Sequence, residues 1–150
     1  MRIHTLDRSL VLPQPVETVF AFFADARNLE AITPPWLRFR VLDPAPIRME
    51  TGARIHYRLR VHGLPLRWES EITVWEPPLR FVDVQRRGPY RLWEHEHCFE
   101  PCAEGTRVLD HVDYAVPGGA LVHRLLVARD VNAIFDYRGR VLAQRFAAGG

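Results

Sequence analysis

Residues 93–100, WEHEHCFE, show the alternation of a β-strand and indicate which face of that strand points inward. Successive side chains of a strand point to opposite faces of the sheet. Glu94, Glu96 and Glu100 therefore share one face, which we assign to solvent. The inner face then carries Trp93, His95, His97 and Phe99. Imidazoles among aromatic rings are unusual on an inner face, so the two histidines are the first candidates for functional residues.

The same kind of alternation continues on both sides of this stretch and predicts an antiparallel meander. Strands are expected at 3–12, 37–42, 53–63, 64–76, 79–85, 90–100 and 106–116. The last six follow one another at roughly ten-residue spacing, and the breaks between them contain Pro or Gly, which favours hairpin connections. The meander therefore accounts for most of the chain after Trp36.

Helical patterns flank the strands. Apolar residues at helical spacing predict a short helix over about 15–24, and a second short helix is expected in 27–33. A long helical tract covers 120–148, with a slip in its apolar phase that predicts a kink near Arg129. One long helix lying across a sheet that must bury one face predicts an α+β fold, in which a curved sheet of about seven strands grips the helix. Closure around the helix can leave a cavity.

Composition limits the class of protein. With 150 residues, 47% of them hydrophobic, the chain is expected to form one domain over 1–150. The net charge of +2 comes from scattered residues, so we expect no nucleic-acid partner. All twenty basic residues are arginines, which excludes a lysine Schiff base and a P-loop lysine.

Location and assembly follow from what the sequence lacks. No apolar run reaches the roughly 18 residues of a membrane span, and the first residues lack a signal-peptide core. We therefore expect a cytoplasmic protein without integral membrane association. Cys98 and Cys102 do not form a C-x-x-C motif and are expected to be free thiols. A homodimer is left open.

Polar residues recur on the inner faces of neighbouring strands. In 106–116, the apolar Val108 and Val112 bracket Asp110, which should therefore point inward together with Tyr114. In 79–85 the register is ambiguous. An inward Phe81 would bring Asp83 inward, whereas the apolar Val82 and Val84 argue for the opposite register.

The inward histidines admit three kinds of chemistry. Two histidines on one face occur in metal sites, with Asp110 or Asp83 as a third ligand, but a divalent ion usually needs a fourth ligand as well. A histidine oriented by Asp110 could move protons on a bound carbonyl compound. The same groups could instead hydrogen-bond the polar end of a hydrophobic molecule or satisfy one another. We favour the last interpretation, with no metal and no cofactor.

Four stretches resemble a bacterial subgroup of the START/polyketide-cyclase-like superfamily, also called SRPBCC. They are NLEAITPPWLRFRVL (28–42), RFVDVQRRGPYRLWEHEHCFEP (80–101), GTRVLDHVDYAVPGG (105–119) and IFDYR (134–138). The resemblance implies the helix-grip fold of the birch pollen allergen and of lipid-transfer START domains, with a hydrophobic ligand cavity between the sheet and the long helix. It carries over no catalytic residue.

The sequence therefore predicts that the protein binds a small hydrophobic or amphipathic molecule, such as a lipid or a polyketide-like or aromatic compound. The alternative is a cyclase or dehydratase that uses His/Asp acid–base chemistry. The expected ligand-binding residues are Tyr57, Trp68, Ser70, Asp83, Trp93, His95, His97, Phe99, Asp110, Tyr114 and Phe135.

Overall fold

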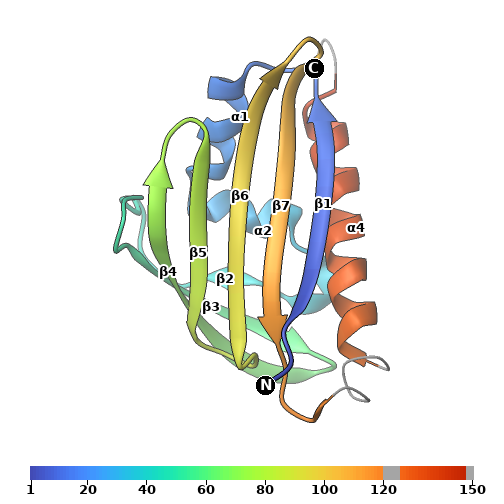
Figure 1. Cartoon of the computed structure of the whole chain (residues 1–150). Coiled ribbons are helices and arrows are strands. Elements are labelled where there is room, and N and C mark those ends of the chain that lie inside the picture. Colours follow the sequence, from blue (N-terminus) through green and yellow to red (C-terminus); the bar gives the residue numbers. More distant parts are fainter. Residues whose placement is uncertain (120–125, 148–150) are drawn as a thin grey trace.

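A seven-stranded antiparallel sheet forms most of the molecule (Figure 1). The computed structural model describes residues 1–119 and 126–147. The strands are β1 (His4–Leu12), β2 (Arg40–Val41), β3 (Arg54–Val61), β4 (Leu64–Glu76), β5 (Arg80–Arg87), β6 (Leu92–Cys102) and β7 (Gly105–Ala115). Their order in the sheet is β1-β7-β6-β5-β4-β3-β2, so the first strand of the chain pairs with the last. The predicted α+β fold with a curved antiparallel sheet is confirmed.

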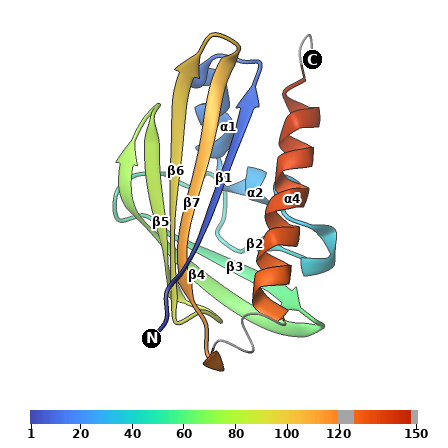
Figure 2. The ribbon, with the colours of Figure 1, turned by 45° about the vertical axis from the view of Figure 1, so that its right-hand side comes forward.

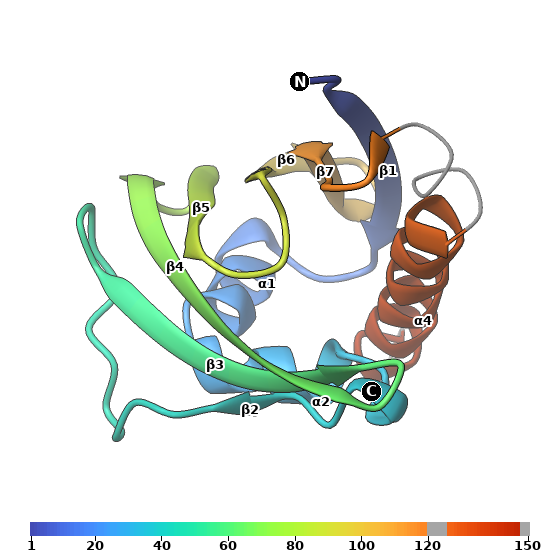
Figure 3. The ribbon, with the colours of Figure 1, turned by 90° about the horizontal axis from the view of Figure 1, so that it is seen from below.

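The helices lie on the inner side of the curved sheet (Figures 2 and 3). The short helix α1 (Val16–Phe23) is followed by a 3₁₀ turn (Ala26–Asn28), by α2 (Leu29–Ile32) and by a second 3₁₀ turn (Pro35–Leu37). The long helix is α4 (Ala128–Arg145). No helix within the described ranges is both long and apolar enough to cross a bilayer.

The helical tract predicted for residues 120–148 can be compared with the structure only in part. Residues 120–125 and 148 of that tract lie outside the described residues. A wider, π-helical turn at Leu126 and Val127 precedes α4, close to the kink expected at Arg129. From Ala128 to Arg145 the helix continues without a break.

The strand predicted at 37–42 is shorter than expected. Only Arg40 and Val41 pair with β3. Leu37 ends a 3₁₀ turn that begins at Pro35, and Arg38 has a left-handed backbone with φ of 47°. A left-handed residue cannot continue an extended strand, so pairing begins only after it.

The faces of β6 are as the glutamates predicted. His95 and His97 are buried, at 4% and 2% exposure, whereas Glu94 and Glu100 are exposed. The ambiguous register of β5 is also settled, because Asp83 pairs with His95 and therefore points to the same inner face. Val82 and Val84 lie on the other face and are buried as well, which explains the mixed signal in the sequence.

Two apolar clusters fill the space between sheet and helices. The larger one packs α1 against β6 and β7 and includes Phe20, Phe23 and Phe99. The smaller one joins Val112 and Tyr114 to the α4 residues Val131 and Phe135. Between the sheet and α4, the side chains leave a cavity.

Candidate functional site

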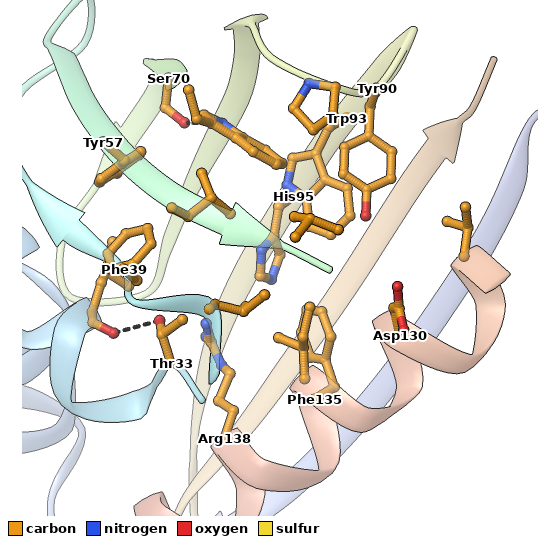
Figure 4. Close-up of a pocket in the computed structure, with 18 of the residues that line it drawn as sticks. Thr33, Phe39, Tyr57, Ser70, Tyr90, Trp93, His95, Asp130, Phe135 and Arg138 are labelled. Carbon is orange, nitrogen blue, oxygen red and sulfur yellow. Dashed lines mark hydrogen bonds between the residues drawn. The ribbon is translucent and has the colours of Figure 1, made fainter. Parts of the chain in front are cut away.

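The cavity has a volume of about 620 Å³ and lies between the inner face of the sheet and α4 (Figure 4). Much of its wall is apolar or aromatic, with Leu29, Ile32, Leu37, Phe39, Leu59, Val61, Trp68, Trp93, Val116, Ile134 and Phe135 among the lining residues. A volume of this size suits a small molecule of drug-like or short-lipid dimensions.

Polar side chains gather on one wall of this cavity. His95 Nε2 lies 2.7 Å from Asp110 Oδ1, and His97 Nε2 lies 2.6 Å from Asp83 Oδ2. The two imidazole rings stack at a centroid distance of 3.6 Å. Because an ionised carboxylate only accepts hydrogen bonds, both Nε2 atoms carry the proton and donate it. Each histidine therefore has a fixed tautomer and a carboxylate partner.

Arg138 completes this polar cluster, which we define as Asp83, His95, His97, Asp110 and Arg138. It reaches inward from α4 (Figure 4), and its guanidinium donates a hydrogen bond of 3.1 Å to Asp110. The guanidinium also lies over the rings of Phe23 and Phe135, at 5.2 and 5.6 Å from their centroids. Its Nε is buried and has no hydrogen-bond partner within the described part of the chain.

The sequence analysis missed Arg138, although a signal for it exists. The buried residues of α4 are Val131, Phe135, Arg138 and Leu142, which follow the spacing of a single helix face. An arginine in the middle of an apolar stripe is seldom buried unless it is paired. Here Asp110 is the partner.

The protonation states follow from burial and neighbouring charges. Burial alone raises the pKa of a carboxyl group, but Arg138 and the hydrogen bond from His95 outweigh it and hold the pKa of Asp110 below its ordinary value. Burial likewise opposes ionisation of Asp83, yet the hydrogen bond from His97 lowers its pKa. Burial, helped by the stacked His95 ring, lowers the pKa of His97 to about 4. Both carboxylates are therefore ionised near neutral pH, while His97 is neutral.

We expect the neutral state of His97 to make the fold sensitive to acid. As pH falls from about 6.5, the ordinary pKa of histidine, the unfolded chain binds a proton that the native protein resists until about pH 4. The free energy of unfolding should therefore fall across this window, by up to about 3 kcal/mol. Urea unfolding at pH 7.5 and 4.5 gives the measurement. The free energy of unfolding should fall less between these two pH values in His97→Phe than in the wild type.

The comparison between these two proteins removes the contributions of His56 and His111. Hydrogen bonds to Asp43 and Asp7 raise the pKa values of His56 and His111, respectively, so these half-buried residues stabilise the fold below pH 6.5, with the opposite sign. They are present in both proteins. Equal pH dependence in wild type and variant would contradict the assignment of His97 as neutral.

The expected ligand-binding residues fall into three groups. Those that line the cavity are Tyr57, Trp68, Ser70, Asp83, Trp93, His95, His97 and Phe135. Asp110 is not part of the cavity wall, but it holds the His95 imidazole, which is, by a hydrogen bond. Phe99 and Tyr114 share the inner face but lie outside the cavity wall. Phe99 is packed against Phe20 and Phe23 of α1, and Tyr114 lies in the smaller apolar cluster.

Aromatic side chains form a second part of the wall, which we call the aromatic cluster. Trp68, Tyr90 and Trp93 contact one another with ring centroids 4.8 to 5.5 Å apart. The Gln85 side chain fixes Tyr90 by donating to its carbonyl at 2.8 Å and accepting from its N–H at 3.1 Å. The ring of Tyr90, from the turn between β5 and β6, is therefore held over the cavity (Figure 4).

A hydrogen bond crosses the rim of the cavity. His62 is in the β3–β4 hairpin, and its Nε2 lies 2.8 Å from Oδ2 of Asp130 in the first turn of α4. Both residues belong to the cavity lining. The contact therefore ties the hairpin to the helix at the edge of the cavity.

Asp83, His95 and His97 also form a potential metal-binding group, because one ligand atom of each lies within 4.8 Å of the others. Both Nε2 atoms, however, already donate protons to carboxylates, and the Arg138 cation lies 3.1 Å from Asp110. A metal ion at these Nε2 atoms would have to displace the protons, and at His97 Nδ1 it would meet the Arg138 guanidinium, which lies 3.4 Å from that atom.

We accordingly expect protein purified without chelators to contain no stoichiometric transition metal. Elemental analysis by plasma mass spectrometry provides the measurement. A one-to-one metal content that disappears in the double variant His95→Ala/His97→Ala would show that these histidines bind an ion.

A curved sheet that grips a long helix and encloses an apolar cavity defines a helix-grip protein of the SRPBCC superfamily. The family model described as "Polyketide cyclase / dehydrase and lipid transport" matches residues 12–136, and the chain belongs to this family. None of the curated proteins matches the sequence.

Solved structures share the fold over nearly the whole chain. Protein Ms6760 from Mycobacterium smegmatis is 19% identical, with 97% of this chain and 92% of that chain covered and a TM-score of 0.72. TTHA0849 from Thermus thermophilus is 24% identical, with 99% and 100% covered and a TM-score of 0.66. The major latex-like protein 151 from Panax ginseng is 10% identical, with 97% and 98% covered and a TM-score of 0.71. At these identities, the likeness concerns the fold.

Proposed function

We propose that this protein binds one small hydrophobic or amphipathic molecule in the cavity between the sheet and α4, and that it does so in the cytoplasm without a metal or a cofactor. The observation that carries the proposal is the unequal distribution of polar and apolar side chains over the wall of the 620 Å³ cavity. Apolar and aromatic side chains surround most of the space, and Asp83, His95, His97 and Arg138 converge on one side. Such a wall fits a molecule with an apolar body and one polar end.

The polar cluster is suited to orient that end. His95 directs Nε2 at Asp110, which leaves Nδ1 as the ring atom for a ligand. Ser70 and Tyr57 line the same cavity, and Trp68 Nε1 donates to Ser70 Oγ at 3.0 Å. Because its partners hold each group in place, a ligand would meet preorganised donors and acceptors.

Native mass spectrometry of freshly purified protein should detect a retained small molecule that is released on denaturation. The neutral fluorescent probe N-phenyl-1-naphthylamine should also bind with one-to-one stoichiometry. Ile134→Trp, which places an indole in the cavity, should abolish probe binding, whereas Arg140→Trp on the exposed side of the same helix should not. Probe binding that is unchanged in Ile134→Trp would contradict the proposal.

A second candidate is acid–base catalysis on a carbonyl compound, which the 2.7 Å contact between His95 and Asp110 favours. A carboxylate that holds the imidazole in one tautomer leaves Nδ1 as the proton acceptor, so Nδ1 could remove a proton next to a bound ketone. The test is hydrogen–deuterium exchange at the α-carbon of 2-tetralone in D₂O, followed by NMR. Exchange that is about a hundredfold slower in His95→Gln, with the ketone still bound, would support catalysis. Equal exchange in both proteins would exclude this reaction.

A further inference from the structure

We propose that the cavity selects hydrophobic molecules whose polar end is a cationic amine, held beside Asp83 and against the aromatic cluster. This inference rests on the proposed function and deepens it, because it names the chemical class of the ligand's polar end. It depends on three features of the cavity wall: its charge, the position of Asp83, and the rings next to that carboxylate.

The first feature is an imbalance of charge. The polar cluster contains two carboxylates, Asp83 and Asp110, and one guanidinium, Arg138. Arg138 pairs with Asp110 at 3.1 Å, and Asp110 also accepts the hydrogen bond from His95. Asp83 is bonded to His97, whose neutral imidazole supplies a proton but no charge. Asp83 thus shares the charge of Arg138 with Asp110, and a partly buried carboxylate gains from a cation of its own, which a ligand in the cavity could supply.

The second feature is the accessibility of Asp83. Its side chain is 20% exposed and lies in the cavity wall, whereas the Asp110 side chain is 9% exposed and lies behind His95. Of the two carboxylates in the polar cluster, Asp83 is therefore the one that a ligand meets first. An ammonium group there can form a charge-assisted hydrogen bond.

The third feature is the aromatic cluster beside this carboxylate. Asp83 pairs across the sheet with His95, and Trp93 is two residues before His95 on the same face of β6. The Trp93 and His95 rings are 6.3 Å apart, and Trp93 contacts both Trp68 and Tyr90. Ring faces attract cations, and walls of several aromatic rings are a common way to bind ammonium groups.

The same features disfavour an anionic end. A ligand carboxylate would approach Asp83, while Arg138, the guanidinium in the cavity lining, already donates to Asp110, and its Nε, unpaired among the described residues, is buried. At the rim the lining contributes a further acidic residue, Asp130, bonded to His62. Like charges at close range in a poorly hydrated site repel each other strongly. The cavity should therefore rank amine above alcohol and alcohol above carboxylate.

Three probes of equal chain length test this ranking: decylamine, 1-decanol and decanoate, titrated at pH 7.5 and followed by calorimetry and by tryptophan fluorescence. Decylamine, protonated at this pH as lysine is, should bind at least about tenfold more tightly than decanol. Decanoate should bind more weakly than decanol. In Asp83→Asn the advantage of decylamine over decanol should vanish.

Glu94→Gln is the matched control, because Glu94 is an acidic residue on the exposed face of β6. This variant should keep the full amine preference. Decanoate binding as tightly as decylamine, or a preference that survives in Asp83→Asn, would overturn the inference. If Asp83→Asn does not fold, the ranking in the wild type decides alone.

Decanol binding without any amine preference would overturn this inference and leave the proposed function standing. Binding of none of the three, together with no retained molecule and no binding of N-phenyl-1-naphthylamine, would remove both.

Discussion

Ending the chain at Arg129 should abolish cooperative folding. This truncation removes nearly all of α4, including the buried Val131, Phe135 and Leu142 and the cover they provide for the inner face of the sheet. Each buried apolar side chain of this size stabilises a fold by roughly 1.5–3 kcal/mol. Three of them approach the 5–15 kcal/mol that a typical domain has in total.

Urea unfolding followed by circular dichroism measures the effect. A chain that ends after Ala147 is the matched control, because it retains α4 and the buried Phe146. The control should unfold in one transition close to that of the full chain. If the chain that ends at Arg129 also gave one sharp transition, the sheet would have to bury its inner face by itself.

Arg138→Met should destabilise the protein by about 3–5 kcal/mol, the range expected when one partner of a buried ion pair is removed. Methionine can fill much of the space between Phe23 and Phe135, so the main loss is electrostatic. Asp110 would keep its hydrogen bond to His95 but lose its counter-charge. The free energy of unfolding from urea titrations gives the measurement.

A double variant separates charge from packing in this prediction. Asp110→Asn combined with Arg138→Met removes both charges, and it should be more stable than the sum of the two single effects predicts. Arg140→Met, on the exposed side of the same helix, should change stability by less than about 0.5 kcal/mol. Strict additivity of the two single variants would show that Arg138 and Asp110 do not interact.

The sequence predicted which face of a strand a residue occupies better than it predicted whether that residue borders the cavity. In β6, three glutamates mark the outer face without ambiguity, and the inward position of His95 and His97 follows from strand geometry alone. Phe99 shares their face but lies where α1 fills the space. Alternation cannot say which section of an inner face borders a cavity, because that depends on where the helices pack.

The polar cluster was predictable on the sheet and less so on the helix. Asp83 was ambiguous because β5 buries residues on both of its faces, as Val82 and Val84 show. Arg138 belongs to a tract with many arginines, most of which are exposed. Its partner, Asp110, is 28 residues away in the sequence, so only the folded chain brings the two together.

The cavity also has a thermodynamic consequence. The cavity of about 620 Å³ exists only in the folded protein. A molecule that binds there therefore makes contacts with the native state that the unfolded chain cannot make. Binding to the native state alone raises the free energy of unfolding by about 2.7 kcal/mol at a ligand concentration of 100 times Kd. The melting temperature therefore reports occupancy of the cavity. A thermal-shift screen could rank unknown compounds without any assay of activity.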